Sequence, residues 1–449
     1  MAELNWTSLL STDRIRPSSQ PETHDLVVRN PFEADYDRIV GSSSVRRLQD
    51  KAQVFPLQED DVARTRLTHS IEVSGLARSL GKAVGKKLEQ RGVFSTEQTE
   101  MLAALLQVTG LIHDLGNPPF GHYGETAICD WFRNWFNSSP LLNTNDIVFN
   151  TQQKEDFLCF DGNAQNWRIV TKLQTLNDAF GANFTYATLG TIIKYPWQSD
   201  ERPNGKKKFG YYFSEKEEAE RVRNALGLNK NVRHPATYLL EAADDIIYLC
   251  DDIEDGVKKG LIEWPQEYDI IKKNLLKKTN SARIGELLSR IDAKRTDWRL
   301  PRVEKSIAGV RNFRNAVQRF LFEYTIEQFI DHYDLLMKNE SNENLLKMEL
   351  LKCDQDLKEL CDELSRVAQE YCFSCREVLS LESAGHKVIH SLLDIYVPAL
   401  IENDGEKLAN IKHYPGKLFH RISPNFVYAA MFGLVKKSAV GKHPKSGTG

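Results

Sequence analysis

Apolar residues recur at helical spacing along much of the chain. From Val73 to Val84, within residues 67–88, they follow one another at intervals of three and four, which places them on one face of a helix. Residues 101–115 are apolar almost throughout and predict a buried helix that stops before Gly116 and the Pro-Pro pair after it. The pattern therefore predicts one amphipathic helix and one buried helix in this part of the chain.

Two further helices are predicted downstream. Residues 123–136 predict one of them. Pro235 stands just inside the start of the other, which reaches Lys259, with Gly260 where a C-terminal cap belongs. The segment FGYYF at 209–213 has the composition of a short strand. We expect an all-α fold, with room for one small β-hairpin.

Composition and charge narrow the class of protein. Hydrophobic residues make up 41% of the 449 residues and charged residues 27%, as is usual for globular proteins. The 59 Lys and Arg residues against 62 Asp and Glu give a formal net charge of −3, which argues against a globally basic nucleic-acid-binding surface. The N-terminal residues do not follow the signal-peptide pattern, and the most apolar run is too short to span a bilayer. We expect a cytoplasmic protein that does not contact membranes.

Cysteines add little to this picture. The seven cysteines are scattered, and only Cys372 and Cys375 form a Cys-x-x-Cys pair. A structural zinc site of this type usually has a second pair. We interpret these residues as reduced thiols of an intracellular protein.

Candidate metal ligands stand on the first two predicted helices. His69 lies four residues before Val73, so it shares the apolar face of its helix. A single histidine on such a face is more often an ordinary core residue. His113 and Asp114 end the buried helix, where a carboxylate needs a compensating partner such as a divalent cation. The alternative for this pair is a helix end without any metal.

Acidic residues interrupt the helix that begins at Pro235. Asp244, Tyr248 and Asp252 are spaced by four residues and therefore line one face. Acids on one stripe of an apolar helix indicate a polar cavity. For Asp251 and Asp255, an acidic outer face remains the alternative interpretation.

A candidate acid–base pair lies at the start of the helix predicted over 123–136. His122 and Glu125 are three residues apart, close enough for the carboxylate to orient and charge-stabilise the imidazole. General acid–base catalysis uses this arrangement, because histidine titrates near neutral pH. A simple surface pair is the alternative.

The order of these residues resembles that of a known enzyme family. His69, then His113-Asp114, then Asp244 match the H…HD…D signature of the HD phosphohydrolase superfamily. More specific words surround them, namely RRLQDKAQVFP (46–56), TRLTHS (65–70), HDLGNPPFGHYGE (113–125), GNAQ (162–165), EAADDIIY (241–248) and, more loosely, GHKVIHSLLDIY (385–396). Together they resemble the bacterial deoxyguanosinetriphosphate triphosphohydrolase family.

The resemblance implies a metal centre and a catalytic pair. A divalent metal would be held by His69, His113, Asp114 and Asp244, with Asp244 matching the family's ligand better than Asp245. Mn²⁺ or Mg²⁺ is the first choice, and Co²⁺, Fe²⁺ or Zn²⁺ is the alternative. His122 would be the catalytic histidine, with Glu125 as its orienting partner.

The resemblance also implies contacts with the phosphates and the sugar. Arg66, nearly one helical turn before the first metal ligand, would reach a phosphate, and Lys194 and Tyr195 match residues that contact the polyphosphate. Gln53 and Asp252 match residues that recognise the deoxyribose 3′-hydroxyl, and Tyr248 matches one that packs on the sugar. Asn163, in the GNAQ word, is expected near the site without an assigned role.

For the base, Phe373 and Glu382 fall where the family places stacking and guanine-edge contacts. A solvated helix residue is the alternative interpretation of Glu382, so guanine preference is a hypothesis taken from the family.

The implied activity is metal-dependent hydrolysis of dGTP, with the other dNTPs as further candidates, to a deoxynucleoside and inorganic triphosphate. The alternatives are another HD phosphohydrolase, acting on deoxynucleoside monophosphates or cyclic nucleotides, and a sensor of nucleotides or single-stranded nucleic acid. The family resemblance further implies a homo-oligomer, often a hexamer. A single-stranded DNA or nucleotide effector is a further expectation, to which the basic run Lys206–Lys208 points weakly.

Four regions are expected along the chain. An N-terminal segment (1–45) precedes the HD-domain catalytic core (46–260). A C-terminal helical region (261–439) is expected to contribute to the substrate pocket and to oligomer interfaces, and residues 440–449 to form a disordered tail.

Overall fold

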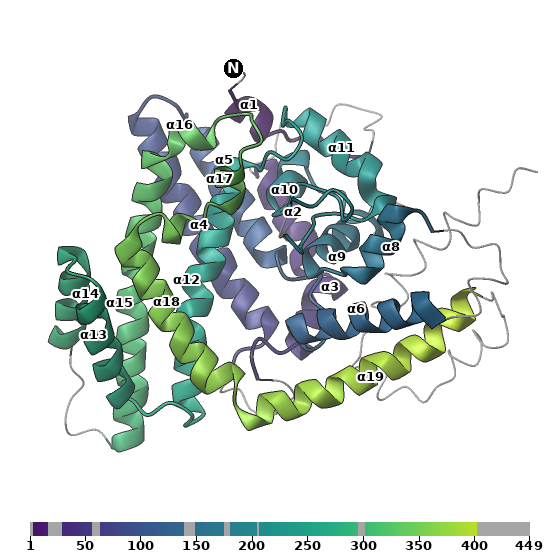
Figure 1. Ribbon diagram of the computed structural model, residues 1–449. Coiled ribbons are helices and arrows are strands. Elements are labelled where there is room, and N and C mark those ends of the chain that lie inside the picture. The colour runs from purple at the N-terminus through teal and green to yellow at the C-terminus, as the bar shows by residue number, and fades with distance from the viewer. Residues whose placement is uncertain are drawn as a thin grey trace, which may run out of the picture. The chain divides into compact units, whose positions relative to one another are not determined.

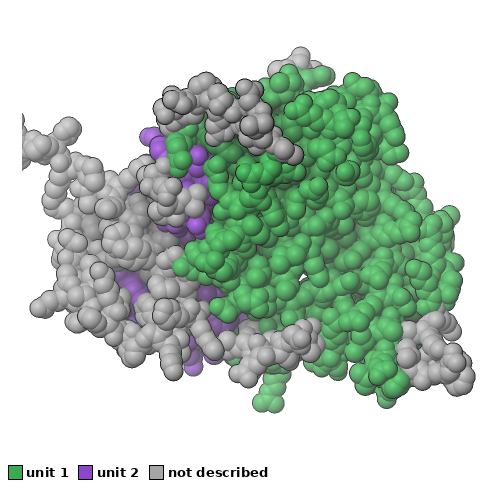
Figure 2. Space-filling view, turned by 180° about the vertical axis from the view of Figure 1, so that it is seen from behind, with its two compact units in different colours: residues 1–113, 184–193, 222–381 green, residues 114–183, 194–221, 382–449 purple. Residues whose placement is uncertain are grey.

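The computed structural model describes residues 3–16, 29–55, 63–138, 149–174, 180–203, 206–294 and 301–401. Helices joined by turns make up this part of the chain (Figure 1), so the predicted all-α class is confirmed. The chain packs into two compact units, coloured separately in Figure 2. Unit 1 comprises residues 1–113, 184–193 and 222–381, and unit 2 comprises residues 114–183, 194–221 and 382–449.

Unit 1 contains most of the helices. They are α1 (Trp6–Leu9), α2 (Pro31–Val40), α3 (Ser43–Arg46), α4 (Arg66–Gln90), α5 (Thr96–Ile112), α10 (Tyr186–Thr191), α12 (Pro235–Lys258), α13 (Gln266–Lys278), α14 (Ala282–Ala293), α15 (Arg302–Asp331), α16 (Tyr333–Leu336), α17 (Glu343–Lys347) and α18 (Gln355–Val367). Three short turns of tighter or wider helix, η1 (Arg47–Asp50), η4 (Leu350–Lys352) and η5 (Ala368–Phe373), lie between them.

Unit 2 is built from shorter pieces. They are α6 (Gly121–Ser138), α8 (Thr151–Leu158), α9 (Gly162–Arg168), η2 (Ile169–Leu173) and η3 (Phe213–Glu215). Two helices, α11 (Lys216–Ala225) and α19 (Arg376–Ile401), contribute residues to both units. The four regions expected from the sequence, with boundaries after residues 45, 260 and 439, stay a prediction. The tail 440–449 lies outside the described residues.

The four predicted helices are present as α4, α5, α6 and α12. The helix expected over 101–115 begins earlier, at Thr96, because the Ser95 hydroxyl accepts from the Gln98 amide and caps the helix there. Pro235 opens α12, and Gly260, just beyond it, has the positive φ of a helix end. No helix in the described ranges combines the length and apolar character needed to cross a membrane.

The strand expected at 209–213 is absent. Phe209, Tyr211 and Tyr212 are buried, but the backbone there is irregular and leads into η3. The β-structure in the described residues is confined to isolated bridges, such as that between Ala52 and Thr65. Strand propensity depends on an available partner strand, and the aromatic side chains here are buried without one.

Helices α4 and α5 approach each other backbone to backbone. A Cβ added at Gly81 of α4 would lie 2.9 Å from the Ala103 Cα of α5, and one added at Gly110 of α5 would lie 2.8 Å from the Ser74 Cα. Only glycine permits such an approach. Helix α12 packs against both α4 and α15 (Figure 1), so α4 is enclosed by α5 and α12.

A buried carboxylate ties the N-terminal part of unit 1 together. Asp35 of α2 is fully buried. Its Oδ1 accepts from Arg14 Nη1 at 2.6 Å, and its Oδ2 accepts from the Thr185 amide and hydroxyl and from the Thr188 hydroxyl at 2.9–3.0 Å. The Asp35 carboxylate therefore joins three separate chain segments.

Replacing this acceptor should destabilise the protein markedly. We expect Asp35→Ala to lower the free energy of unfolding by roughly 3–5 kcal/mol, because the half-buried Arg14 guanidinium loses its ion pair and three buried donors lose their acceptor. Urea denaturation followed by circular dichroism measures the change. Asp37→Ala is the matched control, since the Asp37 side chain is 51% exposed and should matter little. Equal unfolding midpoints for the two variants would contradict this account.

Candidate active site

Three helices of unit 1 bring two histidines and an aspartate together. His69 lies in the first turn of α4, His113 caps the C-terminus of α5, and Asp244 lies in α12. The Asp244 Oδ1 atom is 3.0 Å from His69 Nε2 and 3.4 Å from His113 Nε2. One carboxylate oxygen therefore faces both imidazoles.

The hydrogen bond on the far side of His113 fixes its tautomer. His113 Nδ1 lies 2.7 Å from the Gly110 carbonyl oxygen, which can only accept, so Nδ1 carries the proton. In the neutral ring Nε2 then presents its lone pair toward the Asp244 carboxylate. Two electron-rich atoms that face each other need a cation or an added proton between them.

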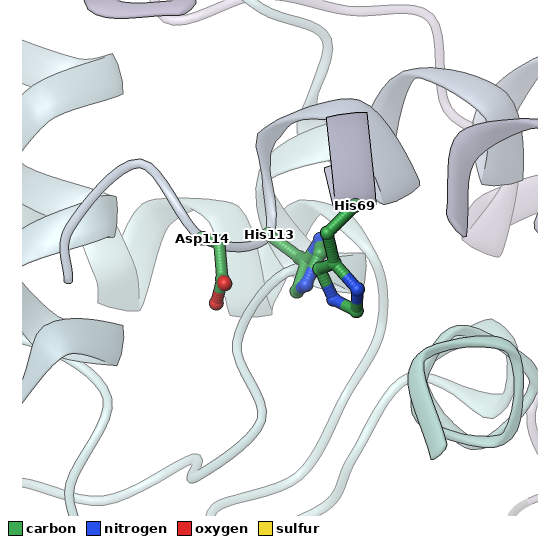
Figure 3. A group of neighbouring side chains, drawn as sticks. All are labelled: His69, His113 and Asp114. Carbon is green, nitrogen blue, oxygen red and sulfur yellow. The ribbon is translucent and has the colours of Figure 1, made fainter. Parts of the chain in front are cut away.

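Asp114 completes the group. Asp114 directly follows His113 in the chain, and the candidate ligand atoms of His69, His113 and Asp114 lie within 4.8 Å of one another. Figure 3 shows the two imidazole rings next to each other and the Asp114 carboxylate nearby; the ring centroids are 5.5 Å apart. The Asn117 side-chain amide donates to Asp114 Oδ1 at 2.6 Å, which holds this carboxylate in one orientation.

The electrostatics agree with a cationic centre. Burial would raise the pKa of Asp244, but the nearby imidazoles of His113 and His69 outweigh it and hold the pKa well below its usual range. The His69 side chain is 1% exposed and that of Asp244 is 28% exposed, so the site is buried on one side and open on the other. Imidazole and carboxylate donors in this combination suit Mn²⁺, Fe²⁺, Co²⁺, Zn²⁺ or Mg²⁺. These residues fit a divalent metal without specifying which one.

The predicted acid–base pair lies in unit 2. His122 and Glu125 stand in the first turn of α6, and His122 Nδ1 is 2.8 Å from Glu125 Oε2. The His122 side chain is 78% exposed while that of Glu125 is 12% exposed. Burial would raise the pKa of Glu125, but the hydrogen bond and charge of His122, together with the Gly162 amide, lower it. Glu125 is therefore an anchored carboxylate that presents an accessible imidazole.

Asn163 lies in α9, one residue beyond that amide. Its backbone N–H and its side-chain amide both donate to Asp161 Oδ1, at 2.7 and 2.8 Å. Burial, followed by the charge of Glu125, raises the pKa of Asp161 to about 6. The structure thus shows Asn163 as part of the cap of α9.

The residues expected to contact the sugar and a phosphate lie in unit 1. Arg66 is the first residue of α4 and is 9% exposed. Gln53 is half-buried, and its buried Oε1 accepts no hydrogen bond from the described residues. Tyr248 and Asp252 lie in α12, and burial, followed by the charge of Asp255, raises the pKa of Asp252 to about 8.

The remaining predicted contacts are spread over both units. Lys194 and Tyr195 are half-buried in the turn after α10, in unit 2. Phe373 ends η5 in unit 1, and Glu382, half-buried in α19, opens the last segment of unit 2. Burial raises the pKa of Glu382. Their roles stay predictions.

Comparison with known proteins places this geometry in a family. The HD domain model matches residues 66–144. The deoxyguanosinetriphosphate triphosphohydrolase-like protein of Listeria monocytogenes is 35% identical over 98% of this chain and 92% of its own length. The chain belongs to the deoxyguanosinetriphosphate triphosphohydrolase family.

Other relatives agree with this membership. The deoxyguanosinetriphosphate triphosphohydrolase of Klebsiella pneumoniae is 32% identical over 94% of this chain and 87% of its own length. A triphosphohydrolase-like protein of Synechocystis is 32% identical over 94% and 92%. The family is one of hydrolases built on the HD domain.

Sequence reasoning missed a buried ion cluster in this family member. Arg64 is 9% exposed and pairs with four carboxylates at 2.5–3.0 Å. We call these residues the Arg64 cluster: Arg64, Glu72, Asp251, Glu254 and Asp255. An outer face had remained open for Asp251 and Asp255, but both are buried. In the sequence Arg64 belongs to no motif, and a single arginine does not by itself indicate a buried cluster.

The Arg64 cluster anchors the start of α4 to the second half of α12. The Arg64 amide also donates to Asp255 Oδ2 at 2.8 Å. Burial and a hydrogen bond with Glu72 raise the pKa of Asp251 to about 10. Burial would raise the pKa of Glu254 as well, but Lys258 and Arg64 lower it to about 2. The cluster therefore lies between the elements that carry Arg66 and Asp252.

Removing the central cation should destabilise the fold in a pH-dependent way. We expect Arg64→Met to lower the free energy of unfolding by roughly 3–5 kcal/mol near neutral pH, because four carboxylates lose the cation they share. The folded-state pKa of Glu254, about 2, lies below its ordinary value of 4.5. Its contribution is therefore present above about pH 4.5 and is lost as the pH falls toward 2.

Urea denaturation at neutral pH and near pH 3 tests this expectation. The difference between the original protein and Arg64→Met should shrink at the lower pH. Arg302→Met is the control, since the Arg302 side chain is 79% exposed and its ion pair with Glu263 lies at the surface. A difference of the same size at both pH values would refute the proposed electrostatic origin.

Proposed function

We propose that this family member is a metal-dependent deoxynucleoside triphosphate triphosphohydrolase. It cleaves dGTP, with other dNTPs as further candidates, into a deoxynucleoside and inorganic triphosphate. The observation that carries the proposal is the Asp244 oxygen facing His69 and His113. Membership of the family supports it, as does the hydrogen-bonded pair of His122 and Glu125.

His69, His113, Asp114 and Asp244 would hold the divalent metal, with Mn²⁺ or Mg²⁺ as the first choice. When bound, such a cation supplies Lewis-acid polarisation of a phosphate oxygen and activation of water. The protein fixes the donors for it: His113 through the Gly110 carbonyl, and Asp114 through Asn117.

His122 is proposed to carry the proton. Attack of water on the α-phosphorus forms one P–O bond and breaks the bond to the 5′-oxygen, which is a poor leaving group without a proton. His122, held through Nδ1 by Glu125, donates that proton and is reprotonated as the attacking water loses its own. General acid catalysis of this kind contributes roughly 10²–10⁴-fold.

Other residues would bind the nucleotide. Arg66, Lys194 and Tyr195 are proposed to contact the polyphosphate. Gln53 and Asp252 would bind the 3′-hydroxyl, and the unsatisfied Oε1 of Gln53 supports this assignment. Tyr248 would pack on the sugar, where a ribose 2′-hydroxyl would collide or lose its hydration. Phe373 and Glu382 are proposed for the base, while Asn163 takes no proposed contact.

Assembly and regulation belong to the same proposal. We expect a cytoplasmic homo-oligomer, with the hexamer as the family's usual form, and interfaces contributed by residues 261–439. A single-stranded DNA or nucleotide effector is expected as well. Lys206 is half-buried and Lys207 is exposed, so their ammonium groups are proposed to contact the phosphates of such an effector.

A product assay tests the activity directly. The protein is incubated with each dNTP and with GTP, with Mn²⁺ or Mg²⁺, and the products are resolved by anion exchange. We expect deoxynucleoside and tripolyphosphate from dGTP and no turnover of GTP. Release of pyrophosphate or monophosphate would instead indicate another HD phosphohydrolase, and binding without turnover would indicate a sensor. Equal rates for the four dNTPs would reject the guanine preference.

Two histidine variants separate catalysis from metal binding. His122→Ala should retain metal and nucleotide binding while turnover falls by roughly 10²–10⁴-fold, because only the proton donor is lost. His113→Ala should lose the metal itself. Mn²⁺ titration and steady-state kinetics measure both effects. His332→Ala serves as the control, since His332 Nδ1 is hydrogen-bonded to the Gln328 carbonyl one helical turn before it and has no proposed role in the site. Near-normal turnover by His122→Ala would remove it from the mechanism.

A further inference from the structure

Two sequence motifs of unit 2, one around Gly116 and one around Gly162, meet at a backbone contact. A Cβ added at Gly116 would lie 2.0 Å from the Gly162 carbonyl oxygen and 2.1 Å from the Asn166 amide nitrogen. The chain that follows His113 therefore lies directly against the first turn of α9. Each motif supplies one of the two backbones in contact, so neither motif predicts the contact by itself.

Asn117 links this contact to a proposed metal ligand. Its side-chain amide donates to Asp114 Oδ1 at 2.6 Å, and this bond sets the direction of the amide, since a carboxylate only accepts. The Asn117 Oδ1 atom then lies on Gly162, where an added Cβ would be only 2.3 Å away. The Asn117 side chain therefore packs directly against the backbone of Gly162, in the space that a larger residue's side chain would occupy.

Glu125 meets the same glycine. Its Oε2 pairs with His122, and its Oε1 accepts from the Gly162 amide at 2.8 Å. An added Cβ at Gly162 would lie 2.9 Å from Oε1. Both carboxylate oxygens are therefore engaged, which leaves Glu125 one orientation.

We propose that Asn117 and Gly162 are positioning residues that orient two carboxylates of the active site together. Asn117 orients Asp114 for the metal, and Gly162 orients Glu125 for His122 while also supporting Asn117. One glycine thereby sets the alignment of the metal ligand and of the acid–base pair. The inference rests on the proposed function and adds the residues that hold its two halves in place.

The expected changes in metal affinity and in turnover follow from general magnitudes and from the lack of space at Gly162. Loss of a partner that orients a metal ligand typically weakens metal binding by about 10- to 100-fold. A misplacement of about 1 Å in a catalytic group can reduce turnover by about 100-fold. A methyl group at Gly162 would lie too close to both Asn117 Oδ1 and Glu125 Oε1, so it must displace the Asn117 side chain, the Glu125 carboxylate, or both.

The first test measures metal binding without nucleotide. The full-length protein is titrated with Mn²⁺ and free Mn²⁺ is followed by electron paramagnetic resonance. We expect Asn117→Ala to raise the Kd for Mn²⁺ about 10- to 100-fold, and to change kcat at saturating Mn²⁺ and nucleotide far less. Thermal unfolding establishes that the variant is folded. An unchanged Kd would overturn the role of Asn117.

The second test uses a double-mutant cycle. Gly162→Ala should raise the Kd for Mn²⁺ and also lower kcat about 100-fold. In the Asn117→Ala background the colliding Oδ1 is gone, so Gly162→Ala should add little to the Kd but should still lower kcat, because Glu125 remains crowded. Gly285→Ala is the control, since nothing lies within 4 Å of a Cβ there.

The outcomes separate the two proposals. Strictly additive effects on the Kd, or an unchanged kcat in Gly162→Ala, would overturn the shared positioning role. If the original protein binds Mn²⁺ in the expected way but hydrolyses no dNTP, the proposed substrate is wrong, and the effect of Asn117→Ala on the Kd still decides the positioning of Asp114. A protein that binds none of Mn²⁺, Mg²⁺, Co²⁺, Fe²⁺ and Zn²⁺ would overturn both.

Discussion

One carboxylate oxygen, Asp244 Oδ1, lies within 3.4 Å of two imidazole nitrogens, and this requires fixed distances between the three helices that carry these residues. The close contact between α4 and α5 fixes the distance between the two histidine-bearing helices. Gly81 and Gly110 remove the side chains that would hold the two helices apart. His69 and His113 therefore lie next to each other because of residues that carry no chemistry themselves.

Much of the fold follows from short-range patterns in the sequence. Helices α4, α6 and α12 are foreseen because apolar spacing, Pro235 and Gly260 act within a few residues of the structure they determine. The strand expected at 209–213 fails because strand formation depends on a partner that no local pattern reveals. Helix α5 begins earlier than its apolar run, since a polar capping box, not hydrophobicity, sets its start.

The candidate site divides along the same line. His113 with Asp114, and His122 with Glu125, are visible because each pair is close in sequence. The proximity of His69 to Asp244, which are 175 residues apart, was expected only through family resemblance. The support from Gly162 to Glu125, across 37 residues, was not expected. Contacts between residues close in sequence were predicted from the residues themselves, whereas contacts between residues far apart in sequence were not.

The Arg64 cluster has a consequence for how this chain can evolve. Its members come from segments about 190 residues apart, and exchange of Arg64 for a neutral residue leaves four carboxylates without the cation they share. A neutral residue at position 64 therefore requires compensating changes among these carboxylates. Among relatives, these positions should therefore covary as a block, and a chimera that joins the first hundred residues of one relative to the rest of another should fold only when both halves carry the same version.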